Sequence, residues 1–207
     1  MVTKSGTDAA FGFRVHSGWA SLIAVTGPLD SSTVVERCRI ELADKAIRGS
    51  VQPYHAAEPM ELKEAERFIE RCRDASNRLA RGALKTASDG LQAKGYRITA
   101  CGLLQSSARP LPAIASILAS HALIHTAEGE LFRDALVEAG THQGLPVLKV
   151  KERDLFDRCA TELHVSADEL QRRLAALGRS LGPPWRQDEK FATVVAWLAL
   201  AVTKRAS

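Results

Sequence analysis

The sequence predicts an α/β fold in which one mixed sheet carries helices on both of its faces. Apolar and polar side chains alternate along much of the first part of the chain, which is typical of strands. A helical period follows over residues 60–93, and an apolar stretch over residues 96–104 comes next. An apolar stretch between helices is typical of a strand covered on both faces. Opening strands with short links suggest antiparallel pairing, whereas the later alternation of strands and helices requires crossovers and a parallel part of the sheet.

Three strands are expected before the first long helix. Residues 11–26 are expected to form a strand, a tight bend or bulge at Gly18 and a second buried stretch. Residues 33–42 alternate polar and apolar side chains imperfectly, which predicts the second strand of a meander. Residues 50–55 are expected to form a short third strand. Residues 1–10 are small and polar, and we expect them to be flexible.

Helices and strands alternate in the middle of the chain. Residues 60–93 keep apolar side chains on one helical face, and Gly95 is expected to end this helix. Residues 96–104 form the expected central strand. A second helix is predicted over residues 113–139, and residues 147–150 form a short strand.

Helical sequence closes the chain. It begins at Asp154, and Ser166 is expected to cap a helix through Leu177, because Ser-Ala-Asp-Glu fits a capping box. A last helix is expected over residues 188–203. The element order is therefore βββαβαβα, and we expect residues 1–207 to form a single domain.

Composition and charge narrow the class of protein. The chain has 207 residues, of which 45% are hydrophobic and 25% charged, so it can bury a core without disulfides. The same values exclude intrinsic disorder, a collagen-like chain and a disulfide scaffold. With 28 Lys and Arg against 24 Asp and Glu, the net charge is +4. This balance permits a polyanionic partner without requiring one.

The sequence predicts a cytoplasmic protein that does not enter a membrane. Its most apolar run, residues 192–202, is shorter than the roughly 20 residues that span a bilayer. Residues 1–10 lack the basic start and apolar stretch of a secretion signal. The cysteines lie far apart, so we expect reduced and buried thiols. The oligomeric state is not predicted.

The element order resembles the ribonuclease H-like fold over nearly the whole chain. Two stretches are similar to its RuvC-like endonuclease branch. Residues 15–21, Val-His-Ser-Gly-Trp-Ala-Ser, lie where that branch turns out of its first strand. Residues 188–196, Asp-Glu-Lys-Phe-Ala-Thr-Val-Val-Ala, resemble the acidic start and alanine-rich face of its final helix. The resemblance implies carboxylates that hold divalent metal ions for phosphodiester cleavage.

The carboxylates that this resemblance implies are incomplete. The acid of the first strand would fall near His16, and the acid of the fourth strand near Gln105, so only Asp188 remains. A neutral histidine and a glutamine cannot replace two anionic ligands of Mg²⁺. We therefore favour a catalytically altered or inactive domain that binds nucleic acid or a protein partner.

A histidine and carboxylate pattern supports a catalytic alternative. His121, His125 and Glu128 are spaced i, i+4 and i+7, which puts them on one face of the second predicted helix. Two imidazoles one turn apart can hold Zn²⁺, and a carboxylate can add an oxygen ligand. A pair of ordinary histidines beside a surface glutamate remains the other interpretation. Asp188 likewise fits either a helix cap or a site.

The catalytic alternative is a metal-dependent phosphodiester or nucleotide hydrolase with a rearranged site. Its divalent metal would be Mg²⁺, Mn²⁺ or Zn²⁺, held by His125, Glu128 and Asp188. The catalytic residues would be His16, Glu128 and Asp188, gathered at the strand ends. Substrate would contact Gln105, Arg109 and Lys190. A third hypothesis, a small-molecule hydrolase, would use Ser106 or Ser107 as its nucleophile.

Overall fold

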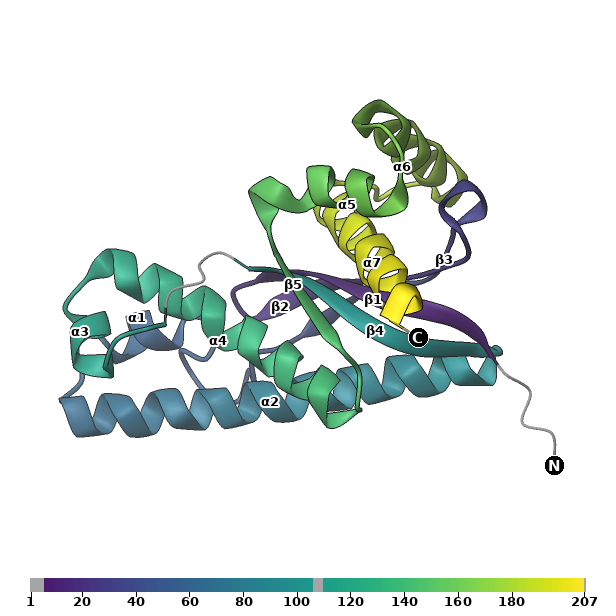
Figure 1. Cartoon of the computed structure of the whole chain (residues 1–207). Helices are drawn as coiled ribbons and strands as arrows, with labels where there is room; N and C mark the ends of the chain where they lie inside the picture. Colours follow the sequence, from purple (N-terminus) through teal and green to yellow (C-terminus); the bar gives the residue numbers. More distant parts are fainter. Residues whose placement is uncertain (1–5, 106–109, 207) are drawn as a thin grey trace.

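The computed structural model describes residues 6–105 and 110–206 and contains one five-stranded sheet (Figure 1). The strands lie in the order β3-β2-β1-β4-β5, and their bounds are β1 (Thr7–His16), β2 (Trp19–Thr26), β3 (Thr33–Glu41), β4 (Tyr96–Gln105) and β5 (Val147–Lys151). β1, β2 and β3 pair antiparallel, whereas β4 runs parallel to β1 and to β5. The predicted α/β class and mixed sheet are confirmed.

The helices lie on both sides of the sheet (Figure 1). Their bounds are α1 (Pro53–Ala57), α2 (Leu62–Ala93), α3 (Ile114–Leu118), α4 (His121–His142), α5 (Leu155–Leu163), α6 (Ala167–Leu181) and α7 (Gln187–Ala206), with short 3₁₀ turns at Leu29–Ser31 and Glu152–Asp154. Within the described ranges, no helix combines the length and apolar character that crossing a bilayer requires.

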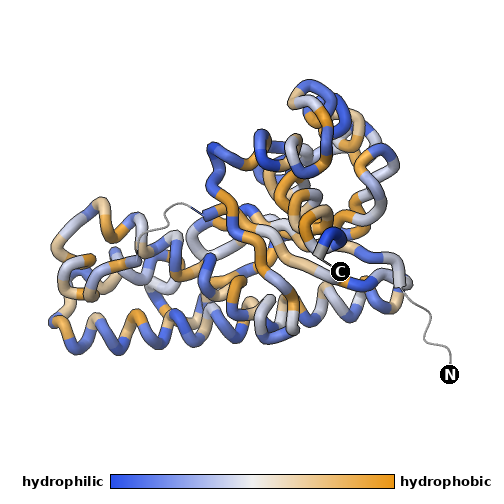
Figure 2. The backbone as a smooth tube through the Cα atoms, viewed as in Figure 1, coloured by the Kyte–Doolittle hydropathy of each residue, from blue (hydrophilic) through white to orange (hydrophobic). Residues whose placement is uncertain are grey.

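One face of the sheet packs against α2 and α4. Alternation along β1 turns Phe11, Phe13 and Val15 to this side, where they join a buried cluster with residues of both helices. The helix α2 runs along the sheet and on to the end of the structure where α1 and α3 lie (Figure 1), with apolar and hydrophilic residues alternating along its tube in Figure 2. The apolar face of α2 therefore packs against the sheet.

The other face packs against α7, which approaches the strands very closely. A Cβ atom at Gly12 would lie 1.9 Å from the carbonyl oxygen of Ala192, and one at Gly102 would lie 2.5 Å from that of Val195. Residues 192–200 of α7 are all buried, as its orange tube in Figure 2 suggests. The apolar run near the end of the sequence is therefore the centre of the second core.

Three sequence predictions are wrong in detail. Residues 50–55 do not form a strand, because Pro53 begins α1, where its missing N–H and fixed φ suit a first helical position. The helix expected over residues 113–139 is two helices, because Ser120 is extended, with φ −141° and ψ 110°. Residues 7–10 of the segment expected to be flexible belong to β1, and residues 1–5 lie outside the described ranges.

The local signals that mark turns and caps agree with the structure. Gly18 has a φ of +81° in the two-residue turn between β1 and β2. Gly95 has a φ of +87° just after α2. The Ser166 Oγ accepts a hydrogen bond from the Glu169 N–H, which confirms the cap of α6. These positions fix where the elements end, and so which residues reach the carboxyl ends of the strands.

Candidate functional site

The residues that the sequence singled out lie on opposite faces of the sheet. Arg14 and His16 alternate with the residues that face α2 and α4, so they lie on the side of α7. Glu128 and His125 belong to α4, on the other side. The structure brings His16 to Asp188 but does not bring Glu128 to either. We call Arg14, His16, Glu152 and Asp188 the strand-end site.

The strand-end site is a chain of paired charges. The His16 Nε2–H donates to Asp188 Oδ1 at 2.9 Å. The Arg14 Nε lies 3.7 Å from the same oxygen, and its Nη1 donates to Glu152 Oε2 at 2.6 Å. His16 and Asp188 are each about one third exposed, at 34% and 30%. Solvent and ligands can therefore reach this pair.

An aromatic side chain extends the strand-end site across the sheet. Trp19 is the cross-strand partner of His16, and the two rings stack with centroids 4.3 Å apart and planes 14° apart. The Arg39 Cζ lies 4.1 Å from the indole centroid, so a cation–π contact forms there as well. Arg39 also donates to Glu41 at 2.8 Å. The result is a half-exposed aromatic ring between a histidine and a guanidinium group.

Asp188 does not make the cap that is seen at the start of α7. The Glu189 Oε2 accepts the backbone N–H of Arg186 at 2.8 Å, which is the reach-back half of a capping box. The described hydrogen bond of Asp188 is the one with His16. Of the two roles left open for Asp188, the structure therefore favours a place in the strand-end site.

The strand-end site does not fit a magnesium ion. Mg²⁺ needs several convergent oxygen ligands, and here the Asp188 oxygen that faces the sheet is already shared by His16 and Arg14. Gln105 follows Leu103 in the alternation of β4 and so falls on the side of α2 and α4. Among the described residues, no group of three potential metal ligands occurs at this site. Arg14 forms ion pairs with both carboxylates of the site, Asp188 and Glu152, which opposes a cation there.

A histidine cluster lies on the other side of the sheet, where α1 meets the start of α4. We use this name for His55, His121 and His125, each of which offers one ring nitrogen within 4.8 Å of the others. The His121 and His125 Nε2 atoms lie 3.0 Å apart and share a hydrogen bond. His121 and His125 are exposed, whereas His55 is half-buried. The expected pairing of His121 with His125 on one face of a helix is therefore present.

Glu128 lies beneath this cluster and binds the first turn of α1. Its Oε1 accepts the backbone N–H groups of Tyr54 and His55 at 2.9 and 3.0 Å, and the His55 Nδ1–H at 3.0 Å. Glu128 is 3% exposed, so it is not the surface glutamate of the simpler interpretation. Burial raises the pKa of its carboxyl group, while the hydrogen bonds from His55 act in the opposite direction.

His55 is the member of the cluster that the sequence does not reveal. The sequence pattern predicts a strand there, and its distance of 66 residues from His121 gives no periodic signal. The one available sign is Pro53, because a proline at a first helical position predicts a helix that presents His55 two residues later. The fold, and not spacing along the chain, brings this third imidazole into place.

The remaining residues predicted for a site belong neither to the strand-end site nor to the histidine cluster. Lys190 is half-buried in the first turn of α7, and its backbone N–H donates to the Arg186 carbonyl at 3.1 Å. Gln105 is half-buried at the end of β4. Arg109 and the two serines proposed as nucleophiles, Ser106 and Ser107, lie outside the described residues.

A pocket rich in arginine lies apart from both places, between α1 and α2. Its lining includes Arg48, Arg67 and Arg71, together with Glu64 and Phe68. The Arg71 Cζ lies 5.5 Å from the centroid of the Phe68 ring. This pocket is a second cationic surface, and a test of anion binding has to distinguish it from the strand-end site.

Comparison with known proteins finds likeness in structure alone. The sequence matches no family model and no curated protein. The structure is similar to that of T. thermophilus RuvC in complex with a Holliday junction substrate, with a TM-score of 0.53 and 10% identity over 95% of each chain. It is also similar to a second Thermus thermophilus RuvC structure, with a TM-score of 0.52 and 11% identity over 96% of each chain. The similarity is therefore one of fold, and it extends over nearly the whole chain.

Proposed function

We propose that this chain, whose fold is the RuvC-like ribonuclease H fold, binds nucleic acid at the strand-end site and does not cleave it there. The observation that carries the proposal is the pairing of Asp188 with His16 and Arg14. Metal-dependent cleavage of a phosphodiester bond needs free carboxylate oxygens that converge on the metal. Here one oxygen of Asp188 is paired with His16 and Arg14, and the positions of the other two implied acids hold His16 and Gln105.

The cations near this pair supply the contacts for phosphate. Arg39 is exposed beside Trp19, and Lys190 follows Asp188 by two residues in α7. Cations that neutralise phosphates release bound counterions, and this release supplies much of the affinity of proteins for nucleic acid. We expect binding that depends steeply on salt and only weakly on base sequence.

The guanidinium plane of Arg39, which lies over the Trp19 ring, gives the site a surface for an unpaired base. Nucleobases stack on guanidinium planes as well as on aromatic rings, and Arg39 is the exposed member of its stack with Trp19. The structurally similar RuvC was seen with a Holliday junction substrate. A four-way DNA junction is therefore the first ligand to test.

Fluorescence anisotropy with a labelled four-way junction, a duplex and a single strand tests the proposal. The double variant Arg39→Gln/Lys190→Gln should bind the junction more weakly. The slope of log K against log salt should fall by about 1 for each phosphate that the variant no longer neutralises. The matched control Arg67→Gln/Arg71→Gln removes the same charge from the pocket between α1 and α2, and we expect it to bind as the unmodified chain does.

The same junction, incubated with Mg²⁺ or Mn²⁺, should remain intact. Cleavage that Asp188→Asn abolishes would overturn the proposal and establish the metal-dependent hydrolase instead. Binding that only the control variant weakens would move the interface to α1 and α2. If the chain binds none of the three nucleic acids, the proposal is overturned and a protein partner is favoured.

We also propose that residues 1–207 form one domain and that the protein acts in the cytoplasm. Both cores pack on the same sheet, which supports a single folding unit. All four cysteines are free, and three of them are buried. Free thiols are typical of a reducing compartment.

A further inference from the structure

Three imidazoles from two helices meet at the end of the structure where α1 and α3 lie (Figure 1). The ring centroid of His55 lies 5.6 Å from that of His121 and 4.8 Å from that of His125, and the two rings of α4 are 4.5 Å apart. One nitrogen of each ring lies within 4.8 Å of the others. We propose that the histidine cluster binds one Zn²⁺ ion, with Glu128 orienting His55 from behind.

The distances between the nitrogens suit this ion. Zinc binds imidazole nitrogens at about 2.0–2.1 Å in a tetrahedral arrangement, which places neighbouring ligand atoms about 3.4 Å apart. The His121 and His125 Nε2 atoms are already 3.0 Å apart. Because these two side chains are exposed, small rotations about their own bonds suffice to bring all three nitrogens onto one ion.

Glu128 selects the ring nitrogen that His55 presents. Its Oε1 accepts a hydrogen bond from His55 Nδ1–H at 3.0 Å, which leaves the Nε2 lone pair of His55 free for a metal. A carboxylate behind a metal-ligating histidine is a recurrent arrangement at zinc sites, where it fixes the tautomer and raises the basicity of the ring. Glu128 is itself held by two backbone N–H groups, so the orientation of His55 is rigid.

The two oxygens of Glu128 explain why it acts through His55 and not as a ligand. Its Oε1 is filled by three donors, and Oε2 is buried without a hydrogen-bond partner among the described residues. Of the three imidazoles, His55 contacts this buried carboxyl group, whereas His121 and His125 are exposed. Three neutral nitrogen ligands favour Zn²⁺ over Mg²⁺, which prefers oxygen. The fourth position of the ion would face solvent and hold water.

Metal titration of the chelator-treated, dialysed full chain tests this proposal. We expect one Zn²⁺ per chain by calorimetry, a rise in Tm on adding Zn²⁺, and the visible absorption of tetrahedral Co²⁺ when Co²⁺ replaces it. His121→Ala and His125→Ala should each weaken Zn²⁺ binding at least tenfold. Both residues are exposed, so neither variant should disturb folding.

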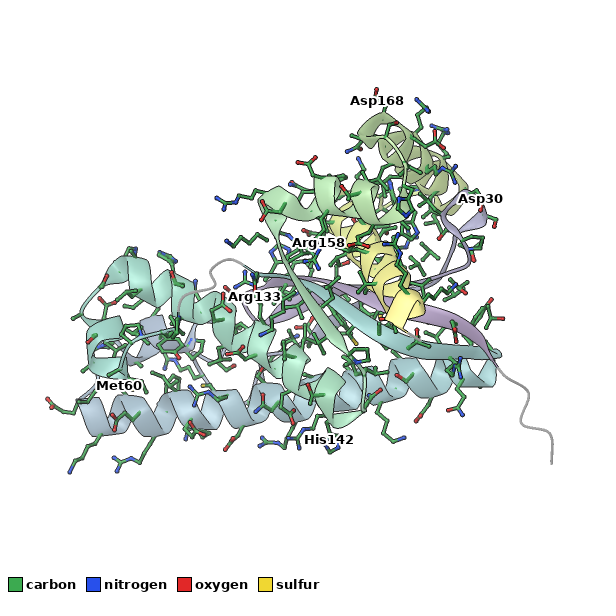
Figure 3. All side chains as sticks on the ribbon, in the orientation of Figure 1. Asp30, Met60, Arg133, His142, Arg158 and Asp168 are labelled. Carbon is green, nitrogen blue, oxygen red and sulfur yellow. The ribbon has the colours of Figure 1, made fainter. Side chains whose placement is uncertain are left out.

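Two further variants separate the cluster from ordinary histidine binding. His142→Ala removes an exposed histidine at the far end of the same helix, labelled in Figure 3, and should leave Zn²⁺ affinity unchanged. Glu128→Gln keeps the acceptor for the backbone N–H groups but loses the charge behind His55, and should lower affinity ten- to a hundredfold. Zn²⁺ binding that survives in both His121→Ala and His125→Ala would overturn the proposal, as would equal loss in His142→Ala.

Discussion

The Nε2 atom of His16 lies 2.9 Å from Oδ1 of Asp188 and so joins the carboxyl end of β1 to the first turn of α7. The two residues are 172 positions apart in the sequence. The contact occupies the place where the RuvC-like resemblance implies a pair of carboxylates around a metal. It holds the strand and the helix together directly.

A double-mutant cycle on His16 and Asp188 measures this contact. Because both side chains are partly exposed, we expect a coupling energy of about 1 kcal/mol, near the value for one hydrogen bond. The free energies of unfolding of His16→Ala, Asp188→Ala and the double variant, measured in urea, give the coupling. A value indistinguishable from zero would show that the two groups do not interact in solution.

Glycine at position 12 is required by the close approach of α7. We expect Gly12→Ala to lower the free energy of unfolding by about 3 kcal/mol, because its methyl group would overlap the carbonyl oxygen of Ala192. Urea denaturation measures the change. Gly82→Ala is the matched control, since a Cβ at that exposed position of α2 meets nothing within 4 Å. The control should be more stable by about 1 kcal/mol, and equal effects of both changes would contradict a close approach of α7 to β1.

Most of the fold could be predicted from sequence because its signals are local. Three of these signals depend only on neighbouring residues: the helical repeat of apolar side chains along α2, the turn at Gly18 and the cap at Ser166. The prediction of a strand over residues 50–55 failed because so short a stretch suits a strand or a helix turn equally, and Pro53 decides between them. The helix over residues 113–139 failed for a similar reason, since Ser120 breaks it without a glycine or proline.

The candidate sites were only partly predictable, because each depends on contacts between distant elements. Spacing along α4 was enough to align His121, His125 and Glu128, but not to show that Glu128 is buried beneath His55. The sequence could not reveal that β1 turns His16 toward α7 while α4 covers the opposite face. His16 and the residues of α4 are separated because α7 and α4 pack on opposite faces of the sheet.

Removal of the Glu128 carboxyl group should destabilise the chain even without metal. Glu128→Ala leaves the N–H groups of Tyr54 and His55 without their acceptor in a largely buried position, which we expect to cost about 2–3 kcal/mol. Glu128→Gln retains an acceptor oxygen and should cost clearly less. Urea denaturation in the presence of a chelator compares the two. An equal loss of stability in both variants would mean that the charge, and not the acceptor, stabilises α1.

The buried thiols should resist alkylation in the folded chain. Burial raises the pKa of Cys101 and Cys159 to about 12 and that of Cys72 to about 11, so about one thiol in a thousand or fewer is ionised at pH 8. A thiol reagent should therefore modify these three only after unfolding, with half-buried Cys38 reacting first. Above pH 9 the unfolded chain loses thiol protons that the folded chain keeps, so the free energy of unfolding should fall as pH rises. Rapid reaction of all four thiols in the folded chain at pH 8 would contradict this packing.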